Sequence, residues 1–325
     1  MKFARRTFLR LASGSVALPA ISRIAVADTY PSRPVHIIVG FPAGGTPDLF
    51  ARLIGEFLSE HLSQSFVIEN RPGAATNVAT EFVVRSAPDG YTLLLIASPN
   101  EINVTLYPEL KFDFTRDIVP VASIGGTPFV IVVNPSFPAQ TLGDLIAYAK
   151  ANPGKIDVAS TGTGNLTYMA AELFKMMAGV DMIQVPARGE AAAQSDLLAG
   201  RVQVMFDPIP SSIGYIRSGK LRALAVTTAT RSALLPDLPL VGDFVPGYEA
   251  SGTIGIGAPK DTPESVIDTL NKAVNAGLTD PKLRARFVAL DAAPMANSAA
   301  GFGKIIADEV AKWGRVIKFA GITPQ

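Results

Sequence analysis

A short apolar run that ends in a glycine-rich loop constrains the fold of this chain more than any other feature. Residues 35–39 have the composition of a buried β-strand, and the Pro-Ala-Gly-Gly sequence at 42–45 then breaks it. Asp48, or Thr46 ahead of a proline, is predicted to cap a helix over residues 49–62. A strand, a glycine loop and a helix N-terminus in this order leave backbone N–H groups unpaired, which suits a small anion.

Strand-like and helix-like segments alternate along the rest of the chain, which predicts βαβ units and a mostly parallel sheet. Strands are expected at residues 35–41, 66–69, 91–97, 119–124, 129–134, 156–160, 182–185, 202–206, 221–227 and 253–258. Helices are expected at 49–62, 77–86, 142–151, 166–179, 191–199, 263–278, 281–289 and 298–320. No internal repeat or low-complexity tract interrupts this pattern.

The length of 325 residues, 48% of them hydrophobic, suggests two domains rather than one. Two extended runs, 127–134 and 252–258, are flanked by glycine and proline and suit hinges between two domains. The same runs would also fit as two central strands of a single large sheet. The sequence leaves both arrangements open.

The composition excludes several kinds of chemistry. The chain has no cysteine and only two histidines, so thiol catalysis, disulfides and cysteine-based zinc sites are ruled out. We also find no Gly-x-Ser-x-Gly elbow and no phosphate-binding P-loop. No cofactor or metal is therefore expected. An exported α/β enzyme that uses Asp207 and a hydroxyl is the weaker alternative, because no base suited to neutral pH is visible.

The first 27 residues have the pattern of an export signal. A basic start with the sequence Arg-Arg-Thr-Phe-Leu-Arg at 5–10 precedes a mildly apolar stretch, and cleavage is expected near Ala27. The arginine pair is typical of twin-arginine export, which places the mature protein in the periplasm. Removal of residues 1–27 leaves 24 basic residues (29 minus 5) against 28 acidic ones, a net charge of −4. This balance gives no reason to expect nucleic acid as a partner.

Four junctions between strands and helices are unusually small or polar: 41–48, 97–100, 160–167 and 206–212. Because ligands in open α/β sheets collect beyond the carboxyl ends of strands, we expect these junctions to form one binding site. Arg188 is a candidate cation for a carboxylate, although a surface arginine is an equally good reading. Asp207 follows a strand and would either accept a hydrogen bond from a ligand or cap the next helix.

Several blocks of sequence resemble one family of binding proteins. They are Tyr-Pro-Ser-Arg-Pro at 30–34, Phe-Pro-Ala-Gly-Gly at 41–45, Glu-Asn-Arg-Pro-Gly-Ala at 69–74, Pro-Asp-Gly-Tyr-Thr at 88–92, the run at 219–227, Leu-Pro-Asp-Leu-Pro at 235–239 and Pro-Gly-Tyr-Glu-Ala at 246–250. Together they resemble the Bug-type extracytoplasmic solute receptors of tripartite tricarboxylate transporters. The resemblance covers essentially the whole chain after residue 27.

The resemblance implies an α/β fold of the type II periplasmic-binding-protein class, with two lobes, two crossover strands and a ligand cleft between the lobes. It places lobe 1 at residues 28–128 plus 253–325 and lobe 2 at 129–252. It implies no enzymatic activity, a small organic carboxylate as ligand, membrane transporter subunits or a sensor domain as partner, and a monomer. Carried over by position, the ligand-binding residues are Phe41, Ala43, Gly44, Asp48, Ser98, Thr161, Gly162, Thr163, Asn165, Tyr168, Arg188, Gly189 and Asp207.

Three positions depart from the family pattern. Members often have His where Tyr168 stands, Tyr where Ala187 stands and Asn where Pro208 stands. The loss of an aromatic ring and an amide is expected to enlarge the cleft or to remove specific contacts. The first-lobe loop is unchanged, so the resemblance implies that it grips one carboxylate.

Overall fold

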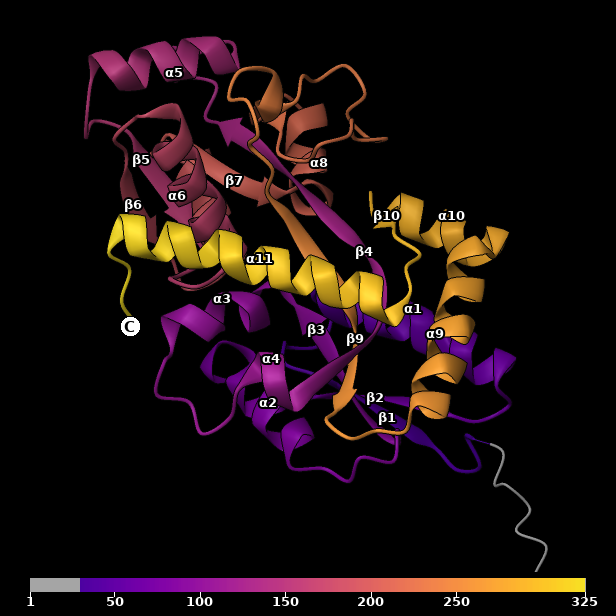
Figure 1. Ribbon diagram of the computed structural model, residues 1–325. Coiled ribbons are helices and arrows are strands. Elements are labelled where there is room, and N and C mark those ends of the chain that lie inside the picture. Colours follow the sequence, from indigo (N-terminus) through magenta and orange to yellow (C-terminus); the bar gives the residue numbers. More distant parts are fainter. Residues whose placement is uncertain (1–29, 325) are drawn as a thin grey trace, which may run out of the picture.

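The computed structural model describes residues 30–324, and the expected signal at residues 1–27 lies outside them. The chain forms two α/β lobes, one above the other in Figure 1, with two long strands running between them. These strands are β4 (Ile118–Val133) and β9 (Ser251–Pro259). No helix within the described residues combines the length and apolar character needed to cross a bilayer.

The first lobe is built on a mixed sheet with the strand order β2-β1-β3-β9-β4. Its remaining strands are β1 (Val35–Val39), β2 (Phe66–Asn70), β3 (Thr92–Ala97) and β10 (Ala293–Pro294). Its helices are α1 (Thr46–His61), η1 (Ala74–Thr76), α2 (Asn77–Val84), α3 (Ser98–Leu106), α4 (Phe114–Asp117), α9 (Glu264–Thr279) and α10 (Pro281–Ala289). Strands β1, β2 and β3 are parallel, whereas β9 is antiparallel to both β3 and β4. The apolar face of α1 packs on this sheet and on α10, where Phe50 meets Phe287 at a ring distance of 5.2 Å.

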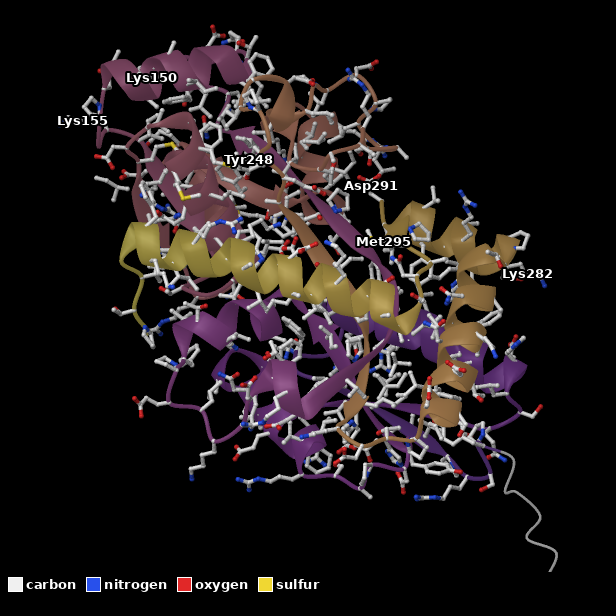
Figure 2. All side chains as sticks on the ribbon, in the orientation of Figure 1. Lys150, Lys155, Tyr248, Lys282, Asp291 and Met295 are labelled. Atoms are coloured by element: carbon white, nitrogen blue, oxygen red, sulfur yellow. The ribbon has the colours of Figure 1, made fainter. Side chains whose placement is uncertain are left out.

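The second lobe repeats the design with a smaller sheet. Its strands are β5 (Asp157–Ser160), β6 (Ile183–Pro186), β7 (Val204–Pro208) and β8 (Arg222–Val226). Its helices are α5 (Leu142–Ala151), α6 (Leu166–Ala178), α7 (Glu190–Leu198), α8 (Ile209–Arg217) and η2 (Val241–Asp243). Tyr248 lies in the core of this lobe, where its hydroxyl donates a hydrogen bond of 2.9 Å to the carbonyl of Ala170 (Figure 2).

Strand β4 changes partners where it passes from one sheet to the other. Its pairing with β9 ends at Pro128 opposite Ser251, and its pairing with β7 begins at Phe129 opposite Pro208. Each lobe therefore has its own hydrogen-bonded ladder along the same strand. The second connection lies just before β9, where the amide of Ala250 donates to the carbonyl of Thr227 at 2.9 Å.

A long C-terminal helix also joins the two lobes. Helix α11 (Ala299–Ala320), yellow in Figure 1, crosses the molecule and packs against both α3 and α6. Trp313 on α11 and Leu106 on α3 belong to the same buried cluster as Phe174 on α6. The lobes thus share one apolar core on this side of the molecule.

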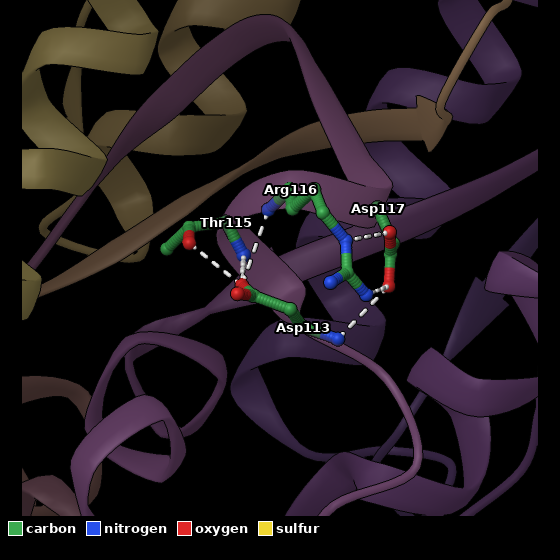
Figure 3. A network of polar contacts seen from close by, with 4 residues as sticks. All are labelled: Asp113, Thr115, Arg116 and Asp117. Carbon is green, nitrogen blue, oxygen red and sulfur yellow. Dashed lines mark hydrogen bonds and ion pairs between the residues drawn. The ribbon is translucent and has the colours of Figure 1, made fainter.

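A compact network of polar contacts lies at the turn that leads into β4. Asp113 caps α4, accepting hydrogen bonds from the amides of Thr115 and Arg116 at 2.9 and 3.2 Å (Figure 3). Asp117 accepts two bonds from the Arg116 guanidinium and one from the amide of Asp113. The hydrogen bond from Arg116 is the main cause that lowers the pKa of Asp117 to about 2. The network is exposed and holds the turn that leads into the crossing strand.

The structure corrects several expectations from the sequence. The strands expected at 119–124 and 129–134 are one continuous strand, because the glycines at 125–126 pair with β9 and β10 and stay extended. The sheet is mixed rather than mostly parallel. Helix α4 was not anticipated. Helices α3 and α8 were expected after the junctions at 97–100 and 206–212 but without bounds, and the helix expected from residue 49 begins at Thr46. Neither Thr46 nor Asp48 is the N-cap residue of this helix. The N-cap is Gly45, and no side-chain hydrogen bond caps this end of the helix.

Candidate functional site

A cavity of about 480 Å³ lies between the lobes, at the carboxyl ends of the parallel strands. Both lobes and both crossing strands contribute to its wall. The lining residues are Phe41, Pro42, Gly45, Thr46, Pro47, Ala97, Ser98, Pro99, Thr127, Phe129, Thr161, Asn165, Leu166, Thr167, Gly189, Glu190, Pro208, Gly252, Thr253 and Ile254.

Helix N-termini converge on this cavity. The first residues of α1 and α3 line it from the first lobe, and those of α6 and α7 line it from the second. Pro208, the N-cap of α8, completes the set. Each helix N-terminus carries a partial positive charge of about half an elementary charge and exposes unpaired N–H groups. The convergence therefore makes a positive potential without any positively charged side chain.

Backbone amides are available on both sides of the cleft. In the first lobe, the amides of Gly45, Thr46 and Asp48 donate to no acceptor within residues 30–324. In the second lobe the same holds, across the described part of the chain, for Leu166 and Thr167 at the start of α6. An oxyanion is the natural partner for such groups.

The first-lobe loop owes its shape to Asp48, which is 1% exposed. Its carboxylate accepts hydrogen bonds from the amide of Gly44 (2.8 Å), from Arg52 (2.9 Å) and from Asn70 (2.9 Å). The Asn70 side chain also donates to the carbonyl of Phe41 at 3.0 Å. Burial raises the pKa of Asp48, but these hydrogen bonds outweigh it, so the net pKa lies below its ordinary value. Asp48 thus stays ionised and organises the loop from behind the cavity.

The second-lobe loop at residues 160–167 is held by its own side chains. The amide and the hydroxyl of Thr161 contact the Thr167 hydroxyl at 2.9 and 2.8 Å. Asn165 donates to the carbonyl of Thr161 at 2.9 Å. Gly164 has φ +85°, and a Cβ built there would approach the side-chain end of Leu106 of α3 to 2.8 Å, so a side chain there would strain the backbone and crowd the contact between the two lobes.

Asp207 lies under the cavity at the end of β7 and is fully buried. Its Oδ2 accepts hydrogen bonds from Gln194 (2.7 Å) and from the Ser212 hydroxyl, while Oδ1 has no partner within the described chain. Burial raises the pKa of Asp207 to about 7, and the charge of Glu190 adds to this rise. The two hydrogen bonds act in the opposite direction and lower the pKa, but less strongly. The group therefore titrates near neutrality.

The predicted site residues divide into two groups. Those that line the cavity are Phe41, Ser98, Thr161, Asn165 and Gly189. Those that lie behind or beside its wall are Ala43, Gly44, Asp48, Gly162, Thr163, Tyr168, Arg188 and Asp207. Among the second group, Arg188 is exposed and forms no ion pair or hydrogen bond within residues 30–324, whereas Asp48 and Asp207 are buried.

Further residues line the cavity that the sequence did not single out as binding residues, among them Thr127, Thr253 and Glu190. Thr127 is 5% exposed, and its hydroxyl has no hydrogen-bond partner among the described residues. The only sequence signal for the two threonines was their place in or beside the expected hinge runs. Among residues 30–324, no cluster of three or more His, Asp or Glu side chains has the arrangement of a metal site.

Comparisons with known proteins agree on one family. Residues 50–322 match the family described as tripartite tricarboxylate transporter family receptor. The chain is 35% identical to protein BugT of Bordetella pertussis over 94% of this chain and 95% of that one. Two solved structures cover 91% of this chain and all of theirs: R. palustris Rpa4515 with adipate (36% identity, TM-score 0.81) and the periplasmic binding protein BugD (33%, 0.77).

The family match covers most of the chain, and the solved structures share the two-lobe fold that surrounds the cavity described above. These relatives are substrate-binding receptors rather than enzymes. The chain therefore belongs to the tripartite tricarboxylate transporter receptor family and is a solute-binding receptor.

Proposed function

We propose that this receptor captures a small organic carboxylate in the cavity between its lobes. The observation that carries the proposal is the convergence of helix N-termini on a cavity with no lysine or arginine in its wall. Oriented amides stabilise an oxyanion without the desolvation cost of a buried cation. Rpa4515 holds adipate, a small carboxylate, in its solved structure.

The first carboxylate would bind to the amides of Gly45 and Thr46, which line the cavity, with the Phe41 ring covering it. From the second lobe, Thr161 and Asn165 would complete the grip. Arg188 stands beside this wall and, being exposed, would need to swing inward to reach a ligand. Apolar side chains, among them Phe129, form much of the remaining wall, which favours a ligand with an apolar body.

The lobes are proposed to close on the ligand as two bodies, with residues 28–128 plus 253–325 as lobe 1 and 129–252 as lobe 2. The change of partners along β4 at Pro128 and Phe129 supports a hinge at this point. Closure would remove water from the cavity and strengthen the hydrogen bonds to the ligand. The packing of α11 on α6 means that the C-terminal helix must slide or bend during this motion.

Export and delivery complete the proposal. A twin-arginine signal cleaved near Ala27 would release the receptor into the periplasm as a monomer, where its closed form would hand the ligand to membrane transporter subunits. The description of BugD as a periplasmic binding protein supports this location. N-terminal sequencing of the exported protein and size-exclusion chromatography would test the cleavage site and the monomer.

A substitution at Thr46 tests the role of the amides. Thr46→Pro removes one N–H at the first position of α1, where proline fits a helix, and Gly45 before it has the extended conformation that proline requires. Titration calorimetry against a panel of carboxylates should show affinity falling about tenfold or more. Thr46→Ala, which keeps the amide and loses only the hydroxyl, is the matched control and should bind nearly as the wild type does. Equal affinities for both variants, or binding of neutral solutes only, would refute the proposal.

A further inference from the structure

One ionisable side chain lines the cavity, and it is acidic. Glu190 is the first residue of α7 and is partly buried. It takes part in no hydrogen bond through its side chain and in no ion pair within residues 30–324. An unpaired carboxylate in a site that otherwise attracts anions needs an explanation.

The charge on Glu190 changes the character of one end of the cavity. At the first position of α7, a carboxylate offsets the partial positive charge of that helix end. The first turns of α1 and α3, on the opposite lobe, also carry carboxylates, but neither lines the cavity. Asp48 is paired with Arg52, and burial raises the pKa of Glu101 well above its ordinary value, whereas Glu190 has no such partner within residues 30–324. The cavity is therefore more positive on the first-lobe side than at α7.

Asp207 lies close enough to extend this negative end. Its Oδ1 has no hydrogen-bond partner in the described chain, and the field of Glu190 reaches its carboxyl group. Arg188, two residues before Glu190, is exposed and lies outside the cavity wall, so water screens its charge from the interior. Unless Arg188 swings inward, it supplies no cation for a second ligand carboxylate.

We propose that Glu190 determines the specificity of the cleft by selecting a ligand whose far end carries a positive charge, such as an ω-amino acid. The inference rests on the proposed binding of a carboxylate at the first-lobe loop. An ammonium group would form an ion pair with Glu190 in a site with little water, whereas a second carboxylate would meet like charge. The receptor would then discriminate amino acids from dicarboxylates of the same length.

Matched sets of acids test this proposal by titration calorimetry on the mature protein. Each set joins an unsubstituted acid, a dicarboxylate and an ω-amino acid of equal length, such as hexanoate, adipate and 6-aminohexanoate, together with the four- and five-carbon analogues. The wild type should bind the amino acid of the best-fitting set more tightly than the dicarboxylate. Glu190→Gln should weaken the amino acid about tenfold, strengthen the dicarboxylate and leave the unsubstituted acid nearly unchanged.

Glu60→Gln is the matched control, because it makes the same charge change at an exposed position on α1. It should leave every affinity unchanged. The role of Glu190 would be overturned if the wild type preferred the dicarboxylate, or if Glu190→Gln did not alter the preference. In either case, binding of the unsubstituted acid would still uphold the proposed function. Failure of all acids to bind would overturn both.

Discussion

The carboxylate of Asp48 accepts a hydrogen bond of 2.8 Å from the backbone amide of Gly44, four residues earlier in the chain. This bond folds the glycine loop back on the first turn of α1 and leaves the next amides without protein acceptors. The side chain that looks from the sequence like a helix cap or ligand contact is thus the support of the loop.

Replacement of Asp48 tests this support. Asp48→Ala removes the acceptor of three hydrogen bonds, one of them from Arg52, and should lower the free energy of unfolding by roughly 2–4 kcal/mol. Ligand affinity should fall as well, because the loop amides lose their fixed direction. Thermal unfolding and calorimetry measure the two effects. Arg52→Ala removes only one of the three donors to Asp48, along with an exposed hydrogen bond to Asn70, and should have the smaller effect on both; the reverse order would contradict this account.

Binding of an unsubstituted acid such as hexanoate should weaken as the pH rises through about 7. The folded-state pKa of Asp207 is raised to about 7, so its carboxyl is neutral below that pH and negative above it. The new charge lies beneath the cavity and repels a bound anion. Affinity measured between pH 5.5 and 8.5 should fall for the wild type and stay nearly flat for Asp207→Asn, which keeps the shape without the charge. The same slope in both proteins would assign the titration to another group.

Gly164 should be intolerant of a side chain because two lobes meet there. Gly164→Ala places a methyl group 2.8 Å from Leu106 and holds alanine at φ +85°. Gly179→Ala is the matched control, since that residue also has positive φ but nothing lies within 4 Å of its Cβ position. Both should lose roughly 1–2 kcal/mol of stability from the backbone. Only Gly164→Ala should also weaken ligand binding; an equal effect of both variants on affinity would exclude a steric role at the lobe contact.

The buried Glu101 should make the stability of the folded protein depend on pH. It is fully buried on α3, and neither oxygen has a hydrogen-bond partner in the described chain. Burial raises its pKa well above the ordinary value, the nearby Glu309 raises it further, and Lys312 opposes them. A raised folded-state pKa means that the folded state binds the proton more tightly than the unfolded state.

The stability contributed by the neutral Glu101 is therefore fully present below the unfolded-state pKa of about 4.5 and is lost as the pH rises toward the folded-state value. Glu101→Gln keeps the shape and removes the titration. Its melting temperature should exceed that of the wild type by more at pH 7.5 than at pH 4.5. A difference that does not change with pH would show that Glu101 does not titrate in this range.

Much of the fold follows from local patterns. The apolar run at β1, the glycines after it and the amphipathic stretch of α1 are readable because strand and helix periods and turn residues act over a few neighbours. Helices α5 and α10 were placed with the bounds that the structure has. Helices α3 and α8 were expected after their junctions but received no bounds, because each follows a strand without a long loop and has a proline in the first turn that reads as a break.

In the candidate site, too, some features could be predicted from local sequence and others could not. The loops at 41–48 and 160–167 were expected to contribute to one binding site, because ligands of open α/β sheets collect beyond the carboxyl ends of strands. Their position on opposite sides of a cleft was implied by the family resemblance. The importance of Glu190 and Thr127 was not visible, since an acidic residue at a helix start and a threonine in an extended run are common everywhere. Only the three-dimensional path of β4 and α7 brings them into the same wall.

The sequence by itself determined the α/β elements, the absence of thiol chemistry, and a first-lobe loop with free amides, because these depend on residue type and near neighbours. The tertiary structure decided which side chains face the cavity. Asp48 turned inward to hold its loop because three donors from separate segments meet there. Glu190 was left unpaired in the wall because no cation from any other element within residues 30–324 forms an ion pair with it. Two of the donors to Asp48 are near neighbours in the chain, but Asn70 comes from a separate strand, and the surroundings of Glu190 likewise depend on distant segments, so no local pattern records the complete set of contacts.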